Sequence, residues 1–201
     1  MDQDRLDIRE VVENWALWRD AGDWDRFRTV WHTDGWMTAT WFQGPASEFI
    51  RVSKEGMERG VNILHFLGGT TIDVDGDRAI AQTKMTILQR AVLDGVEVDV
   101  DCIGRFYDFF AKEGGLWKIV RRQPIYEKDR MFLTHPGEPL PLDPGLLARF
   151  PVGYRHLGYL QTRAGFDVKI GLPGTTGPAV QNLYAEGRAW LAGSATPGSV
   201  S

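Results

Sequence analysis

The stretch IDVDGDRAIAQTKMTILQRAVLDGVEVDVDCIGRFYDFFAKEGGLW, residues 72–117, decides the fold. Its apolar and β-branched runs are separated by Asp75-Gly76, Asp94-Gly95 and Gly114-Gly115. Asp-Gly between two such runs is a strong signal for a tight hairpin turn. The pattern therefore predicts a meander of long antiparallel strands over residues 65–74, 78–93, 96–112 and 116–128.

The third of these strands shows which face is buried. Val96, Val98 and Val100 alternate with acidic residues, which is typical of a strand with one apolar face and one wet face. Arg105 lies on the face opposite the valines. If the valine face packs on helices, Arg105 points away from them.

The part before the meander is helical. Residues 4–19 place Ile8, Val12 and Trp15 at spacings of three and four, which is one face of a helix. We expect a second helix at 24–32 capped by Asp23, a short strand at 36–42 and a third helix at 46–59. Helices followed by a strand meander predict an α+β domain over residues 1–130, with a curved antiparallel sheet.

The remainder forms an extension. Residues 131–145 are rich in proline and predict an extended linker. Residues 146–163 and 178–192 each carry an apolar stripe, so residues 146–193 are expected to be a helical arm or lid that wraps the main domain or a neighbouring subunit. The tail, 194–201, is expected to be disordered.

Composition excludes several classes of function. A net charge of −4 gives no basic surface for nucleic acid. No apolar run is long enough to span a membrane, and the charged N-terminus is not a secretory signal. A single cysteine, Cys102, allows no internal disulfide, which fits a cytoplasmic protein. The histidines His32, His135 and His156 lack ligand-like spacing, so we expect neither a metal nor another cofactor.

Aromatic residues are concentrated near the N-terminus. Six of the eight tryptophans fall within the first 41 residues. They form either a bulky core under the sheet or an aromatic lining for a flat apolar ligand. The candidate substrate-binding residues are Trp15, Trp24, Trp41, Tyr107 and Tyr126.

Three stretches carry a resemblance to a known family. They are WRDAGDWDRFRTVWHTDGWM (18–37), ILHFLGG (63–69) and GLWKIVRRQPIYEKD (115–129). Together with the order of helices and strands, they resemble the SnoaL-like branch of the nuclear transport factor 2-like (cystatin-like α+β) superfamily. The resemblance covers about residues 5–130. It implies a cone formed by a curved sheet and three N-terminal helices, a fold that hosts both enzymes and binding proteins.

The resemblance also implies a catalytic pair. In scytalone dehydratase-like and hexachlorocyclohexane dehydrochlorinase-like enzymes, an Asp after the first helix orients a His that takes a proton from carbon. This places Asp20 and His65 in those roles, with Arg122 as the cation beside the leaving group or oxyanion. The alternatives are that Asp23 or Asp25 is the pocket carboxylate, and that His65 is a core histidine.

For Arg122 the alternative is a surface ion pair with Asp99 or Asp101. Since Arg121 and Arg122 alternate along one strand, only one of the two can face a pocket.

We therefore expect a cofactor-independent lyase or isomerase, dehydratase-like, acting on a small hydrophobic substrate with a ring. It is expected to form a homodimer or homotrimer, because open curved sheets usually bury a face against a partner. One alternative is a non-catalytic binding or assembly subunit, like the β subunits of ring-hydroxylating dioxygenases. An epoxide hydrolase using Asp99 and Asp101 is a third.

Overall fold

The computed structural model describes residues 2–135, 137 and 139–194. The predicted tail therefore lies outside the described residues, apart from Ser194. In chain order the elements are α1 (Asp2–Ala21), α2 (Trp24–Thr29), β1 (Trp31–Thr38), β2 (Gln43–Pro45), α3 (Ala46–Glu58), β3 (Asn62–Asp75), β4 (Arg78–Leu93), β5 (Val96–Glu113), β6 (Leu116–Leu133), α4 (Pro144–Ala148), a 3₁₀ turn (Val152–Tyr154), α5 (Arg155–Arg163) and α6 (Pro178–Leu191).

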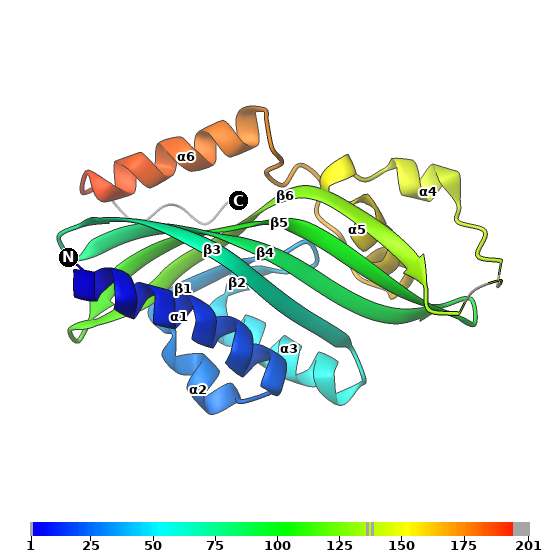
Figure 1. The fold of residues 1–201 in the computed structure, drawn as a ribbon, viewed down its shortest axis with the longest axis horizontal. Coiled ribbons are helices and arrows are strands. Elements are labelled where there is room, and N and C mark those ends of the chain that lie inside the picture. Colours follow the sequence, from blue (N-terminus) through cyan, green and yellow to red (C-terminus); the bar gives the residue numbers. More distant parts are fainter. Residues whose placement is uncertain (1, 136, 138, 195–201) are drawn as a thin grey trace.

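The sheet follows the predicted meander. Strands β3 to β6 pair antiparallel with their chain neighbours, and the full order is β2-β1-β6-β5-β4-β3. The predicted curved antiparallel sheet is confirmed for β3 to β6, and the structure corrects it at one edge, where β1 runs parallel to β6. The six strands therefore form a curved, mixed and unclosed sheet (Figure 1).

The second helix is shorter than predicted. It ends at Thr29 instead of residue 32, and β1 begins at Trp31 instead of residue 36. The carbonyl oxygen of Val30 accepts a hydrogen bond of 2.9 Å from the backbone nitrogen of Ile119 in β6. Pairing with β6 thus ends the helix and starts the strand.

Two bulges in β6 determine which residues face each side of the sheet. Val120 and Glu127 have no register partners on β5, so the alternation of side chains reverses at each. At the second bulge the strands approach closely, since a Cβ on Gly104 would lie 2.1 Å from the carbonyl oxygen of Ile125. Only glycine fits there without moving backbone.

Helices cover both faces of the sheet (Figure 1). Helices α1 to α3 and α5 pack on the face that carries Val98, Val100 and Phe106, which we call the inner face. Helix α6 packs on the other, outer face against a smaller cluster that includes Tyr107 and Phe109. Arg105 faces outward, where it bonds Glu127 and Tyr184, as the alternation predicted.

The C-terminal extension is only partly as predicted. The stripe at 146–163 forms α4, a 3₁₀ turn and α5 because Pro151 cannot continue a helix. Asp129 of β6 anchors α5: its carboxylate accepts from the backbone nitrogen of Leu157 at 2.8 Å and lies 3.0 Å from Nδ1 of His156. This contact near a helix N-terminus is electrostatically favourable. The predicted helix at 178–192 corresponds to α6.

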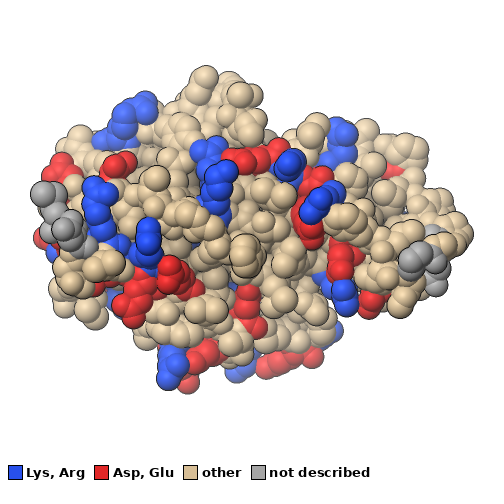
Figure 2. Space-filling model, in the orientation of Figure 1, with Lys and Arg blue, Asp and Glu red and all other residues tan. Residues whose placement is uncertain are grey.

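The surface carries charges of both signs. Figure 2 shows acidic and basic side chains interspersed over the face in view. Several of the exposed charges are paired across strands, as in Arg90 with Asp99 and Arg130 with Asp101. Within the part of the chain that the structure describes, no helix is both long and apolar enough to cross a membrane.

Candidate active site

The site begins at the C-terminal end of α1. Asp20 lies in the last turn of the helix, not after it as predicted. Gly22, with φ +70°, closes the helix, and the backbone nitrogens of Gly22 and Asp23 bond back to Arg19 and Trp18. A carboxylate is unfavourable at this end of the helix dipole. Asp20 is therefore stabilised by contacts outside its own helix.

Those contacts are made to β3. One oxygen of Asp20 accepts from the backbone nitrogen of His65 at 2.5 Å, and the other lies 2.8 Å from its Nδ1. The two side chains are 14% and 7% exposed, respectively. Because an ionised carboxylate only accepts hydrogen bonds, this contact favours the tautomer protonated at Nδ1. Nε2 then has a free lone pair, and among the described residues it has no hydrogen-bond partner.

The other two candidate carboxylates are used differently. Asp23 caps α2, accepting from the backbone nitrogen of Arg26 at 3.3 Å. Asp25 is exposed in the first turn of the same helix. Of the three aspartates, the structure brings only Asp20 to His65.

His65 lines a small inner cavity. Its ring meets Trp15 edge-on at 5.1 Å between centroids, and Trp41, Phe106 and Tyr126 line the same space. The cavity encloses about 30 Å³, which is room for one or two water molecules. The imidazole thus faces a narrow, mostly apolar chamber.

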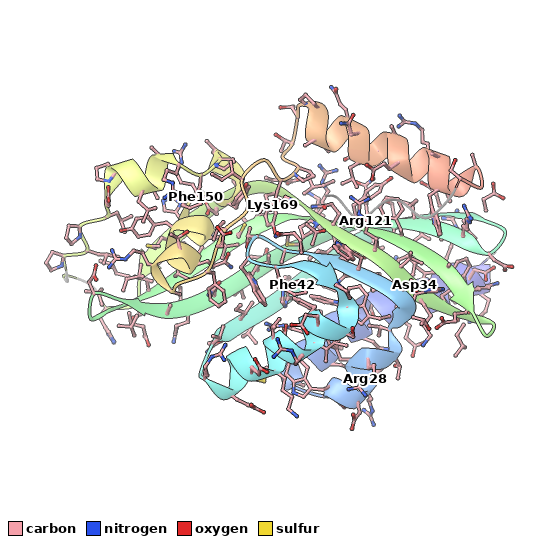
Figure 3. All side chains as sticks on the ribbon, turned by 180° about the vertical axis from the view of Figure 1, so that it is seen from behind. Arg28, Asp34, Phe42, Arg121, Phe150 and Lys169 are labelled. Atoms are coloured by element: carbon pink, nitrogen blue, oxygen red, sulfur yellow. The ribbon has the colours of Figure 1, made fainter. Side chains whose placement is uncertain are left out.

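A larger outer cavity adjoins the inner one. It encloses about 270 Å³ and shares four lining residues with the inner cavity: Arg19, Trp41, Ile63 and Gln161. Phe42, labelled in Figure 3, lines only the outer cavity. We call the four shared residues the neck. The outer cavity can hold a ring-sized molecule, and His65 lines the inner cavity on the other side of the neck.

The C-terminal extension supplies part of this wall. Gln161 of α5 accepts from Thr40 at 2.5 Å and donates to Gln89 at 3.1 Å, and all three side chains are buried. Leu157 lines the inner cavity and Phe166 the outer one. Residues beyond position 150 therefore help to shape the pocket that His65 lines.

Arg122 does not take the predicted place. It is fully buried and forms a two-pronged ion pair with Asp108, with both N–O distances 2.7 Å. Its guanidinium carbon lies 4.2 Å from the ring centroid of Trp15 and 4.0 Å from that of Phe106, and Arg122 does not line the inner cavity. The alternative, a surface pair with Asp99 or Asp101, was also wrong.

The candidate substrate-binding residues divide into two groups. Trp15, Trp41 and Tyr126 line the inner cavity, whereas Trp24 and Tyr107 line neither cavity. Trp24 packs edge-on against Phe27. Tyr107 faces outward against Tyr184 of α6, because it lies one residue from inward-facing Phe106.

Arg19 is the charged pocket residue that the sequence analysis missed. Its side chain is 6% exposed, and Nη1 donates to the carbonyl oxygen of Ile63 at 2.7 Å and to Asp20 at 3.2 Å. A signal for it exists in the sequence, since Arg19 lies four residues after Trp15 on the buried face of α1.

Burial controls the protonation of the site. Desolvation lowers the pKa of His65 below its ordinary 6.5, and the nearby cations Arg19 and Arg122 lower it further, although Asp20 opposes the shift. Burial also raises the pKa of Tyr126 well above its usual range. At neutral pH the site therefore holds a neutral imidazole that can accept a proton and a tyrosine hydroxyl that can donate a hydrogen bond.

This arrangement predicts the pH dependence of His65. A folded-state pKa below that of the unfolded chain means that its contribution to stability is present above pH 6.5 and is lost as pH falls through the folded pKa. In an NMR titration of the ring Cε1 proton, the midpoint of His65 is expected below 6.5. A midpoint at or above that value would show that Asp20 outweighs burial.

The described residues offer no obvious place for a metal. They contain no group of three or more His, Cys, Asp or Glu side chains arranged to hold an ion. Cys102 is buried, and burial raises the pKa of its thiol well above the ordinary value.

Comparison with known proteins identifies the family. Residues 3–123 match the SnoaL-like domain. This chain belongs to the SnoaL-like family. It is also similar to pea pathogenicity protein 2 from Fusarium vanettenii, with 37% identity over 175 residues that cover 85% of this chain and 75% of that protein.

Two solved structures show the same fold at low sequence identity. A hexachlorocyclohexane dehydrochlorinase has 13% identity and a TM-score of 0.56, covering 69% of this chain and 98% of that chain. A putative scytalone dehydratase from Novosphingobium aromaticivorans has 16% identity and a TM-score of 0.52, covering 70% and 100%. The fold of this SnoaL-like protein is thus nuclear transport factor 2-like. Its match to the family domain ends before α5, which lines the pocket.

Proposed function

We propose that this SnoaL-like protein is a cofactor-independent lyase or isomerase, of the dehydratase kind, that begins by removing a proton from carbon. The observation that carries the proposal is the contact between Asp20 and Nδ1 of His65 at the wall of an aromatic cavity, which leaves Nε2 free. A neutral imidazole oriented by a carboxylate is an effective base near pH 7.

In the proposed reaction, a small substrate with a ring occupies the outer cavity and extends its reacting carbon through the neck to His65. Nε2 takes the proton, and Asp20 stabilises the imidazolium that forms. In a dehydration, the C–H electron pair becomes the new double bond, and the hydroxyl group departs from the neighbouring carbon. The proton returns from His65 to that hydroxyl group, so that water is released and no cofactor is consumed.

Tyr126 is proposed to stabilise the charge that develops on a carbonyl oxygen of the substrate. It lines the inner cavity beside His65, and burial keeps its hydroxyl protonated and able to donate. This assigns to Tyr126 the role beside the oxyanion that was predicted for Arg122 from the sequence.

The proposal can be tested by proton exchange before the natural substrate is known. Cyclic ketones and β-hydroxy ketones are incubated with the protein in D₂O, and loss of the α-proton signal is followed by NMR. Wild-type protein is expected to accelerate exchange for at least one member of the panel, and His65→Ala is expected to give the uncatalysed rate. Equal exchange by both proteins would contradict the proposal and favour a binding protein.

A further inference from the structure

At the neck between the two cavities, one edge of the Arg19 guanidinium is not used in hydrogen bonds to the described residues. Among the described residues, the contacts of the Arg19 guanidinium are made by Nη1, with Asp20 and the carbonyl oxygen of Ile63. Its Nε is buried without a partner, and among the described residues Nη2 has no hydrogen bond either. Arg19 lines both cavities, and its side chain is 6% exposed.

The same edge binds carboxylates elsewhere in this protein. Arg122 uses Nε and Nη2 to hold Asp108, and Arg90 uses them to hold Asp99, with N–O distances of 2.6–2.8 Å. Two parallel donors in a plane match the two oxygens of a carboxylate, and such pairs are stronger than neutral hydrogen bonds. A buried guanidinium with this edge open is therefore suited to a carboxylate ligand.

The charges around the outer cavity favour the same ligand. Arg59 is exposed on its lining and has no ion-pair partner among the described residues. The acidic residue of that lining, Glu55, is paired with Arg51. Ser53 adds a hydroxyl that is buried without a partner. The charged side chains of the outer lining are thus two arginines, Arg19 and Arg59, and one glutamate that is already paired.

We propose that the substrate carries a carboxylate, and that Arg19 binds it through Nε and Nη2. The inference rests on the proposed function for the reaction, and it adds the class of substrate: a small acid with a ring, held at the neck. Because Nη1 of Arg19 contacts Asp20, one guanidinium positions the carboxylate relative to the Asp20–His65 pair. The planar edge favours a carboxylate over a tetrahedral phosphate, for which the neck provides no second buried cation.

The test compares acids with their amides by isothermal titration calorimetry, using benzoate, cinnamate and 2-naphthoate against benzamide, cinnamamide and 2-naphthamide. At least one acid is expected to bind about 10- to 100-fold more tightly than its amide. Arg19→Gln is expected to abolish this preference, and Arg19→Lys to retain part of it because the charge remains without the planar edge. Thermal unfolding by circular dichroism checks that both variants fold.

A matched control lies on the other face of the sheet. Arg121 is also buried, pairs with Glu186 through Nη1 and has an unpartnered Nε, and Figure 3 shows it on the side of α6. Arg121→Gln is expected to keep the preference for acids. The proposal is overturned if no acid binds more tightly than its amide, or if Arg121→Gln removes the preference while Arg19→Gln does not.

The preference for acids over amides can be measured independently of catalysis. His65→Ala removes the base but leaves Arg19 in place, so this variant is expected to bind the acid as well as the wild-type protein does. Loss of proton exchange in His65→Ala with retained binding supports both proposals. Retained exchange in His65→Ala refutes the proposed reaction alone, since binding of the acid still reports on Arg19.

Discussion

Replacing Asp20 with Asn is expected to lower kcat by about 10²- to 10⁴-fold while leaving the fold intact. In the wild-type protein the carboxylate of Asp20 accepts from Nδ1 of His65 and so keeps Nε2 free to act as a base. An amide can place its NH₂ group against Nδ1, which favours the tautomer with the proton on Nε2. The imidazole then has no lone pair facing the cavity, and the imidazolium loses its negative partner.

The measurement is the rate of proton exchange or turnover at saturating substrate, for wild type, Asp20→Asn and Asp25→Asn. Asp25 is the matched control because it lies five residues away and is exposed. It is expected to show wild-type rates. If Asp20→Asn retains full activity, the contact with His65 serves only to join α1 to β3, and the proposed mechanism fails.

Local signals in the sequence were enough for most of the fold. The Asp-Gly pairs at 75–76 and 94–95 and the glycine pair at 114–115 each act between adjacent strands, so they determine the hairpins without knowledge of the rest of the chain. The parallel pairing of β1 with β6 joins segments about ninety residues apart in sequence. No local pattern specifies such a pairing, and for that reason the end of the second helix was predicted too late.

Side-chain directions in β6 could not be predicted by counting residues. Alternation from Ile119, which faces inward, would point Arg121 inward and Arg122 outward. The bulge at Val120 reverses this, so that Arg122 faces inward to Asp108 and Arg121 faces outward to Glu186. A bulge depends on how two strands fit together, and the sequence of one strand does not reveal it.

The contacts between distant segments were harder still. The pairing of Asp20 with His65 was predicted only through a resemblance to a family. Gln161 and Phe166 carry no motif, and their place in the pocket depends on the anchoring of α5 to β6 by Asp129. The burial of Arg19, in contrast, could have been predicted from the sequence, because its spacing from Trp15 places it on the buried face of α1.

The extension completes the wall of a pocket that is lined mostly by residues before position 131. Helix α6 covers the outer face of the sheet (Figure 1), and residues of α5 pack on the inner face and line the cavities. A chain of hydrogen bonds links Thr40, just after β1, to Gln161 of α5 and then to Gln89 of β4. Because it lies beside the neck, the extension contributes both an apolar wall and directed hydrogen-bonding groups, which are the features that distinguish one substrate from another.

Replacing Asp108 with Ala is expected to destabilise the protein by about 3–5 kcal/mol, as measured by urea denaturation. Burial raises the pKa of Asp108, and the two-pronged pairing with Arg122 opposes that shift. Neither side chain is accessible to solvent. Removal of the carboxylate would leave the guanidinium buried without its counter-charge, with Nη1 already lacking a partner.

The double variant Asp108→Leu with Arg122→Met separates the charge from the packing. It removes both charges and keeps apolar volume against Trp15 and Phe106, so it is expected to recover most of the lost stability. Removal of one partner of the exposed Arg90–Asp99 pair serves as the control, and its effect should be small by comparison. An equally large loss in the double variant would mean that the guanidinium is needed for its contacts with the two rings, and that charge pairing is secondary.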